Sequence, residues 1–269
     1  MTAMTLTPSR IGRDVGFGGV LRSEWIKFWS LRSTYWSLGA ALVLSVGISL
    51  LAALAIGSIT GPEELAMNVT VGQLGTFGIF LTQLGVGVLG AIFITGEYST
   101  GMIRSTFAAV PTRLPALFAK AVVLFTTSFV VGLAIIVAAA VSGAMTFASM
   151  DRPVEFTEFG TEVALPILGG ALFLALLSVF ALAVGAIVRA GAGAIAIVLA
   201  ILLVVPTVLT AIPVEWVQDM SQYLLSSSGP GLAAAQAIDA DFWRDLLVTI
   251  AWPAVAMVGA AAVVAGRDA

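Results

Sequence analysis

Residues 163–212 read VALPILGGALFLALLSVFALAVGAIVRAGAGAIAIVLAILLVVPTVLTAI, and Arg189 is the one charged side chain among them. A helix of about 20 apolar residues crosses the roughly 30 Å of bilayer hydrocarbon. One continuous helix over the whole stretch would be about 75 Å long, far more than a membrane needs. We therefore predict two membrane-spanning helices that meet in a tight turn at Arg189.

The rest of the chain has the same apolar character. Hydrophobic residues make up 59% of the 269 positions and charged residues only 10%, against roughly one half and one quarter in soluble domains. We predict a single all-α integral membrane domain over residues 1–269. Its six transmembrane helices are expected at about 36–59, 74–95, 121–145, 163–188, 194–212 and 246–265.

The distribution of charge predicts how these helices are oriented. With six spans, ten of the twelve basic residues fall on the side that holds both ends of the chain. These are Arg10, Arg13, Arg22, Lys27, Arg32, Arg104, Arg113, Lys120, Arg189 and Arg267. Basic residues concentrate in cytoplasmic loops of membrane proteins. We therefore expect a multi-pass protein of the bacterial plasma membrane with both termini in the cytoplasm.

The composition also excludes several functions. The chain has no cysteine and no histidine, which removes disulfides, thiolate nucleophiles and histidine-based metal or proton sites. No G-x-x-x-x-G-K-[ST] loop occurs, so we expect no nucleotide site and no bound cofactor in this chain. The predicted spans contain no charged residue, which disfavours an ion-coupled carrier. We expect a protein that is not itself an enzyme and binds no nucleic acid.

Residues 20–36 read VLRSEWIKFWSLRSTYW and precede the first apolar stretch. At about 100° per residue, the aromatic side chains gather on one face and polar ones on the other. We predict an amphipathic helix over residues 20–35 that lies in the cytoplasmic headgroup plane, although Arg32 falls near the apolar face. Its characteristic residues are Trp25, Lys27, Phe28, Trp29 and Arg32. Such a helix is either a membrane anchor alone or also borders a cytoplasmic partner.

Residues 96–120 read GEYSTGMIRSTFAAVPTRLPALFAK and follow the second predicted span. Because a carboxylate within a bilayer is costly, we expect Glu97 to end that span at the membrane surface. Residues 100–109 can form a short helix with Ile103 and Phe107 on one side and Arg104 exposed. Pro111 and Pro115 are expected to stop this helix and direct the chain into the third span. The alternative is a plain basic turn.

These two segments, SEWIKFWSLRSTYW and GEYSTGMIRSTFAAVPTR, resemble the permease subunits of ABC-2 type transporters, in particular their compact bacterial six-span members. The resemblance implies that the first segment is an amphipathic connecting helix and the second a cytoplasmic coupling helix that docks on a separate ATPase subunit. It implies coupling roles for Glu97, Tyr98, Gly101, Ile103, Arg104, Ser105 and Phe107. It also implies a second permease copy or a paralogue as partner, and ATP with magnesium in the ATPase.

Residues 213–245 connect the fifth and sixth predicted spans. Within them, the stretch SQYLLSSSGPGLAAAQAI is too apolar for a solvated loop and too short and interrupted for a span. We predict two short re-entrant or interfacial helices around Gly229, Pro230 and Gly231, as similar family members carry there. A disordered loop is the alternative.

Within the predicted spans, Gln83 is the one amide well inside the bilayer. It either bonds to another helix or lines a transport pathway. The apolar spans favour export of a small amphipathic or lipid-like molecule. A non-transporting membrane signalling component and, less favoured, an ion-coupled carrier are the alternative functions.

Overall fold

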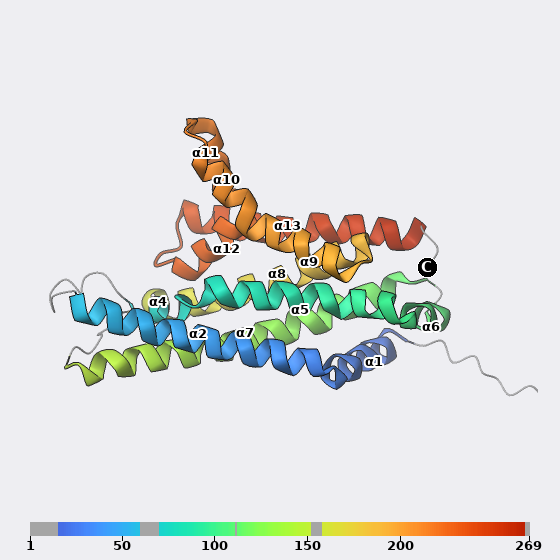
Figure 1. The fold of residues 1–269 in the computed structure, drawn as a ribbon, viewed down its shortest axis with the longest axis horizontal. Helices are drawn as coiled ribbons and strands as arrows, with labels where there is room; N and C mark the ends of the chain where they lie inside the picture. Colours follow the sequence, from blue (N-terminus) through green and yellow to red (C-terminus); the bar gives the residue numbers. More distant parts are fainter. Residues whose placement is uncertain (1–15, 60–69, 111, 152–157, 267–269) are drawn as a thin grey trace, which may run out of the picture.

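The computed structural model describes residues 16–59, 70–110, 112–151 and 158–266, which form an elongated bundle of helices (Figure 1). Six helices in this part of the chain are long and apolar enough to cross a membrane. They run over Arg32–Ser58, Ile79–Thr100, Leu114–Ser149, Gly160–Val188, Gly191–Ala211 and Ala240–Gly266. The predicted all-α architecture with six spans is confirmed, and it indicates a multi-pass membrane protein.

The fourth span lies at the centre of the bundle. It consists of a π-helical turn, η1 (Gly160–Ala164), followed by α8 (Leu165–Val188). Around it pack α5 (Ile79–Thr100), α7 (Leu114–Ser149) and α13 (Ala240–Gly266). In its most apolar stretch 72% of the residues are buried, the largest share among the six spans.

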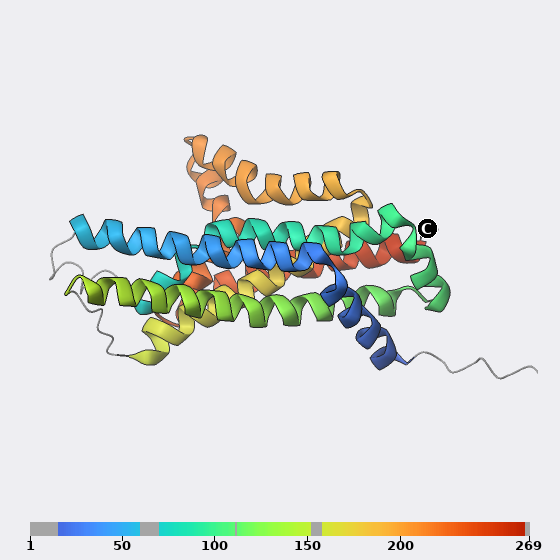
Figure 2. The same cartoon turned by 60° about the horizontal axis from the view of Figure 1, so that its bottom comes forward.

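The fifth span, in contrast, is peripheral, with only 17% of its most apolar stretch buried. It is built from α9 (Gly191–Leu199), the π-helical turn η2 (Ala200–Val204) and α10 (Val205–Ala211). Its outer part diverges from the bundle together with α11 (Glu215–Ser221) (Figures 1 and 2). The chain turns between α8 and α9 where predicted, because Arg189 adopts a left-handed conformation with φ of 60°.

The N-terminal segment is broken into two helices, which corrects the predicted continuous helix over 20–35. The first helix, α1 (Phe17–Ser30), diverges from the axis of α2 (Arg32–Ile59) (Figure 2). Between them Leu31 is extended. Hydroxyls from α2 satisfy the last carbonyls of α1: Thr34 Oγ1 donates to Phe28 O at 2.9 Å and Tyr35 Oη to Trp29 O at 2.8 Å. Arg32 consequently belongs to the first span.

The second span also begins differently from the prediction. A separate short helix, α4 (Val71–Thr76), precedes α5, and Thr70 and Gln73 form a reciprocal capping box at its start. Ser49 Oγ lies 2.7 Å from Leu74 O and 2.8 Å from Ala139 O, which ties α4 between α2 and α7. A helix in this position was not expected, because the apolar sequence around it runs directly into the span.

The chain between the fifth and sixth spans contains two short helices, as predicted, but their division differs. These helices are α11 and α12 (Leu225–Ala234), so Pro230 lies inside α12 and the break falls at residues 222–224. The glycines on either side of Pro230 allow α12 to pack closely on neighbouring helices. A methyl group at Gly229, for example, would overlap the Phe173 ring of α8.

The charged side chains separate by end of the bundle. The end that carries α1 and α6 (Met102–Ala109) is called here the basic end (Figure 1). Its described charged residues are Arg22, Glu24, Lys27, Arg32, Glu97, Arg104, Arg113, Lys120 and Arg189. The opposite, acidic end carries Asp151, Glu158, Glu162, Glu215, Asp219, Asp239, Asp241, Arg244 and Asp245. Arg10, Arg13, Pro111, Arg152 and Arg267 lie outside the described residues.

Candidate functional site

Four charged side chains form a closed ring at the basic end, where α1, α5, α6 and α7 meet. Lys120 Nζ pairs with Glu24 Oε2 and lies 2.7 Å from Glu97 Oε1. On the other side of the ring, Lys27 Nζ lies 2.8 Å from Glu24 Oε1 and 3.1 Å from Glu97 Oε1. Each carboxylate therefore contacts both ammonium groups, and the ring has no net charge.

The ring is deeply buried for a group of four ions. The side chains of Lys120 and Glu24 are 1% exposed and that of Glu97 is 5% exposed, while Lys27 is 28% exposed. Taking such charges out of water costs several kcal/mol per ion unless they are paired and hydrogen-bonded. Alternation of opposite charges around the ring offsets this cost for all four groups at once.

Aromatic and hydroxyl side chains complete the surroundings of the ring. The Lys120 ammonium lies 4.7 Å from the centroid of the Phe93 ring, a cation–π contact. Phe93 packs edge-to-face on Phe28 with centroids 5.2 Å apart. Thr106 Oγ1 accepts a hydrogen bond from Lys27 Nζ at 3.1 Å, which attaches α6 to the ring.

The pKa of Lys27 reflects this environment. Burial disfavours its charged ammonium, but hydrogen bonds and attraction to Glu24 and Glu97 outweigh that penalty and raise the pKa of Lys27 above its usual 10.5. Lys27 therefore stays charged across the physiological range.

Helix α6 projects beyond α5 as a short segment of its own, close to the predicted range of 100–109. Gly101, with φ of 73°, makes the left-handed turn that separates it from α5. Its buried side is formed by Ile103 and Thr106, whereas Arg104 and Ser105 are exposed. The helix thus has one side attached to the bundle and one side free of it.

The seven residues predicted as a coupling site lie on two helices and the link between them: Glu97 and Tyr98 on α5, Gly101 in the link, and Ile103, Arg104, Ser105 and Phe107 on α6. Glu97 is in the ring and Ile103 is buried; Tyr98 lies under Arg189, with 5.4 Å between the guanidinium carbon and the ring centroid. Phe107 lies under Arg113 at 5.6 Å. Glu97 does not end its span as predicted, because α5 continues to Thr100 and the two lysines neutralise its carboxylate.

In the predicted amphipathic helix, Lys27 does not lie on a solvated polar face as expected. It points into the ring beside Glu24, while Phe28 is fully buried and Trp25 is exposed. The predicted spans contained no charged residue, but the observed membrane-spanning helices do. They extend past the predicted spans and include Glu97 and Lys120.

Sequence reasoning missed Glu24, Thr106 and Lys120 as members of this site. A signal for Glu24 was present, because it is the only acidic residue among residues 16–59 and follows Val20 by four positions on one helix face. An acid surrounded by basic residues on an apolar face must find partners in the fold. For Lys120 and Thr106 no local pattern distinguishes them from ordinary surface residues.

Gln83, predicted either to bond another helix or to line a pathway, is fully buried on α5. Neither its amide nitrogen nor its amide oxygen has a hydrogen-bond partner among the described residues. A role of Gln83 in lining a pathway stays a prediction.

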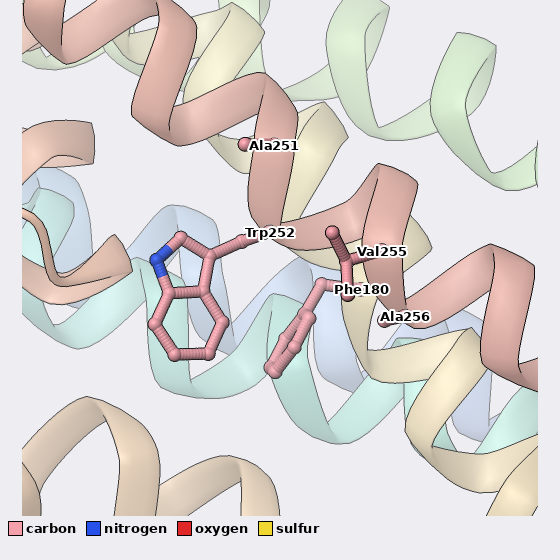
Figure 3. A pocket seen from close by; sticks show the side chains of 5 residues that line it. All are labelled: Phe180, Ala251, Trp252, Val255 and Ala256. Carbon is pink, nitrogen blue, oxygen red and sulfur yellow. The ribbon is translucent and has the colours of Figure 1, made fainter.

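A second feature is an apolar groove of about 360 Å³ on the membrane-spanning part, between α8 and α13. Figure 3 shows its lining: Phe180, Ala251, Trp252, Val255 and Ala256. The rings of Phe180 and Trp252 meet edge-to-face with centroids 5.8 Å apart. Trp252 Nε1 points away from Phe180 and donates to Tyr223 O at 3.0 Å, so the groove offers a ligand no free polar group.

No protein-family model and no curated protein sequence matches this chain.

Proposed function

We propose that this chain is the permease subunit of an ATP-binding-cassette exporter, powered by ATP that a separate ATPase subunit hydrolyses at the basic end. The attachment of α6 to the buried ring carries the proposal. A load applied to the exposed side of α6 would pass from Thr106 to Lys27 on α1 and on to Glu97 on α5. The contact between Glu97 and Lys120 would carry it to α7.

The exposed side of α6 is the surface that we propose for ATPase docking. Met102, Arg104 and Ser105 are exposed there, and none of them takes part in the ring. Arginine with its rigid fork of donors is well suited to pair with carboxylates on a partner surface. In this proposal the basic end is cytoplasmic, as the positive-inside rule predicts for a bacterial plasma membrane.

The proposed cargo is a small amphipathic or lipid-like molecule, moved along an interface that this chain forms with a second copy or a paralogue. The apolar groove beside Phe180 and Trp252 supports this class, since it offers aromatic and aliphatic surface only. An ion-coupled carrier is less well supported, because the carboxylates of the described spans lie near helix ends rather than at mid-membrane, where coupling ions bind.

The test is co-purification of the chain with an ATP-binding-cassette ATPase, followed by ATPase assays in lipid vesicles. Arg104→Glu should reduce ATPase binding and chain-stimulated hydrolysis about tenfold or more, as expected for loss of a charge-assisted pair. Asp219→Arg, an exposed charge reversal on α11 at the acidic end, is the matched control and should leave both unchanged. Equal ATPase stimulation by the two variants would rule out α6 as the docking element.

A further inference from the structure

Helix α1 buries an acidic side chain and leaves large apolar side chains exposed, which is unusual for a helix in contact with water. Val20, Glu24 and Phe28 form its buried side, and Lys27 lies next to them. Its outward side carries Arg22, Trp25 and Ile26, all exposed, together with half-buried Trp29. A helix in water would turn its ions outward and its indoles inward. The outward side of α1 is therefore built for contact with something less polar than water.

Aromatic side chains occur on both sides of the break at Leu31. The four residues Trp25, Trp29, Tyr35 and Trp36 are called here the aromatic elbow. The ring centroids of Trp25 and Trp29 are 6.0 Å apart, and those of Trp29 and Tyr35 are 5.9 Å apart. The hydrogen bond from Tyr35 Oη to Trp29 O joins the two helices. Trp36 follows Tyr35 on α2 and has 80% of its area exposed.

Among residues 16–59, the exposed charges around the aromatic elbow are all positive. Arg22 precedes it on α1, and Arg32 lies at the start of α2; both are exposed. The only acidic residue among residues 16–59, Glu24, is buried and neutralised by Lys120 and Lys27. The outward surface of this segment thus combines indole and phenol rings with unopposed guanidinium groups.

This combination matches the chemistry of an anionic lipid surface. Tryptophan and tyrosine favour the membrane–water interface, where their rings lie among glycerol and upper acyl groups. Guanidinium groups pair with phosphate oxygens in the headgroup layer.

We infer that the aromatic elbow, with Arg22 and Arg32, binds anionic phospholipids of the membrane leaflet at the basic end. The binding fixes the depth of α1 in the interface and holds its charged side on the protein, where the ring of Glu24, Lys27, Glu97 and Lys120 forms. This inference does not depend on the proposed transport function, because it requires only that the helices span a membrane.

Tryptophan quenching by brominated lipids tests it. Full-length protein with Trp216, Trp243 and Trp252 replaced by phenylalanine keeps only the indoles of the aromatic elbow. It is placed in vesicles that contain brominated phosphatidylglycerol or brominated phosphatidylcholine at equal mole fraction. We expect stronger quenching by the brominated phosphatidylglycerol, with local enrichment of about fivefold per arginine. Arg22→Gln with Arg32→Gln should remove the difference between lipids.

Arg104→Gln is the matched control, since Arg104 is exposed at the same end but lies on α6. It should keep the preference for the anionic lipid. Equal quenching by the two lipids would overturn the inference. Absence of quenching by either lipid would also overturn it, because the face would then be covered by protein. As a second measurement that needs no tryptophan replacement, phosphatidylglycerol should raise the unfolding temperature of the wild-type protein more than phosphatidylcholine does.

Discussion

At the basic end of the bundle, α1, α5 and α7 meet through four charged side chains, whereas at the acidic end α4 and α12 meet α8 through glycines. In the first region Glu24, Lys27, Glu97 and Lys120 are held by mutual attraction. In the second, a methyl group at Gly169 would overlap the carbonyl of Leu232, so two helix backbones are almost in contact.

The two regions should therefore respond to different perturbations. The charged ring depends on an equal number of positive and negative charges and tolerates small changes in shape, because flexible lysine side chains can adjust. The glycine contacts depend on shape alone, since close backbone approach leaves no room for added atoms. Variants that alter charge and variants that alter volume separate the two.

The largest effect is expected from Lys120→Met. It leaves Glu24 and Glu97 sharing a single ammonium, an uncompensated buried charge that costs about 3–5 kcal/mol. The unfolding midpoint in detergent should fall accordingly. Arg104→Met, which removes an exposed cation at the same end, is the control and should change stability little. If Lys120→Met and Arg104→Met unfold at the same temperature, the ring contributes nothing to stability.

A volume change at the acidic end is expected to have the next largest effect. Gly229→Ala places a methyl group against the Phe173 ring and should destabilise the protein by about 1–3 kcal/mol through overpacking. Gly39→Ala, at a helical glycine with open space around it, is the control and should be neutral or stabilising. Similar melting temperatures for the two variants would contradict a glycine-dependent contact between α12 and α8.

A smaller change in stability is expected from replacing Gln83, which lies in the interior between the two ends. Gln83→Met removes two buried polar groups that have no partner in the described chain and keeps the side-chain volume. We expect a gain in stability of about 1 kcal/mol, since an unpaired buried polar group is unfavourable. Thermal unfolding of both proteins in the same detergent measures it. A clear loss of stability would indicate that the amide is bonded in the folded protein.

The smallest effect concerns pH. The pKa of Lys27 is raised in the folded protein, so its contribution to stability is complete below its unfolded value near 10.5 and is lost as pH rises through the folded value. The unfolding temperature of the wild type should therefore fall more steeply above this pH than that of Lys27→Arg, whose guanidinium stays charged. Parallel pH curves for the two proteins would show that Lys27 contributes no such dependence.

Much of the architecture was predictable from the sequence. Apolar stretches of spanning length predicted the six long helices, and the isolated Arg189 predicted the turn between the fourth and fifth spans. The pattern of residues 100–109 predicted a short helix, observed as Met102–Ala109. Helix ends were less predictable. Glu97 was expected to end its span, but pairing with Lys120 neutralises it and α5 continues to Thr100.

The sequence by itself determined the all-helical fold and the separation of charge between the two ends, because both follow from local hydropathy and the order of residues along the chain. The tertiary structure alone decided which side of α1 faces inward and which four charges form the ring. Glu24 and Lys120 lie 96 positions apart, so no local pattern can pair them. Their pairing arises only when helix packing brings two carboxylates and two ammonium groups into one site of low polarity, where each ion must find a partner.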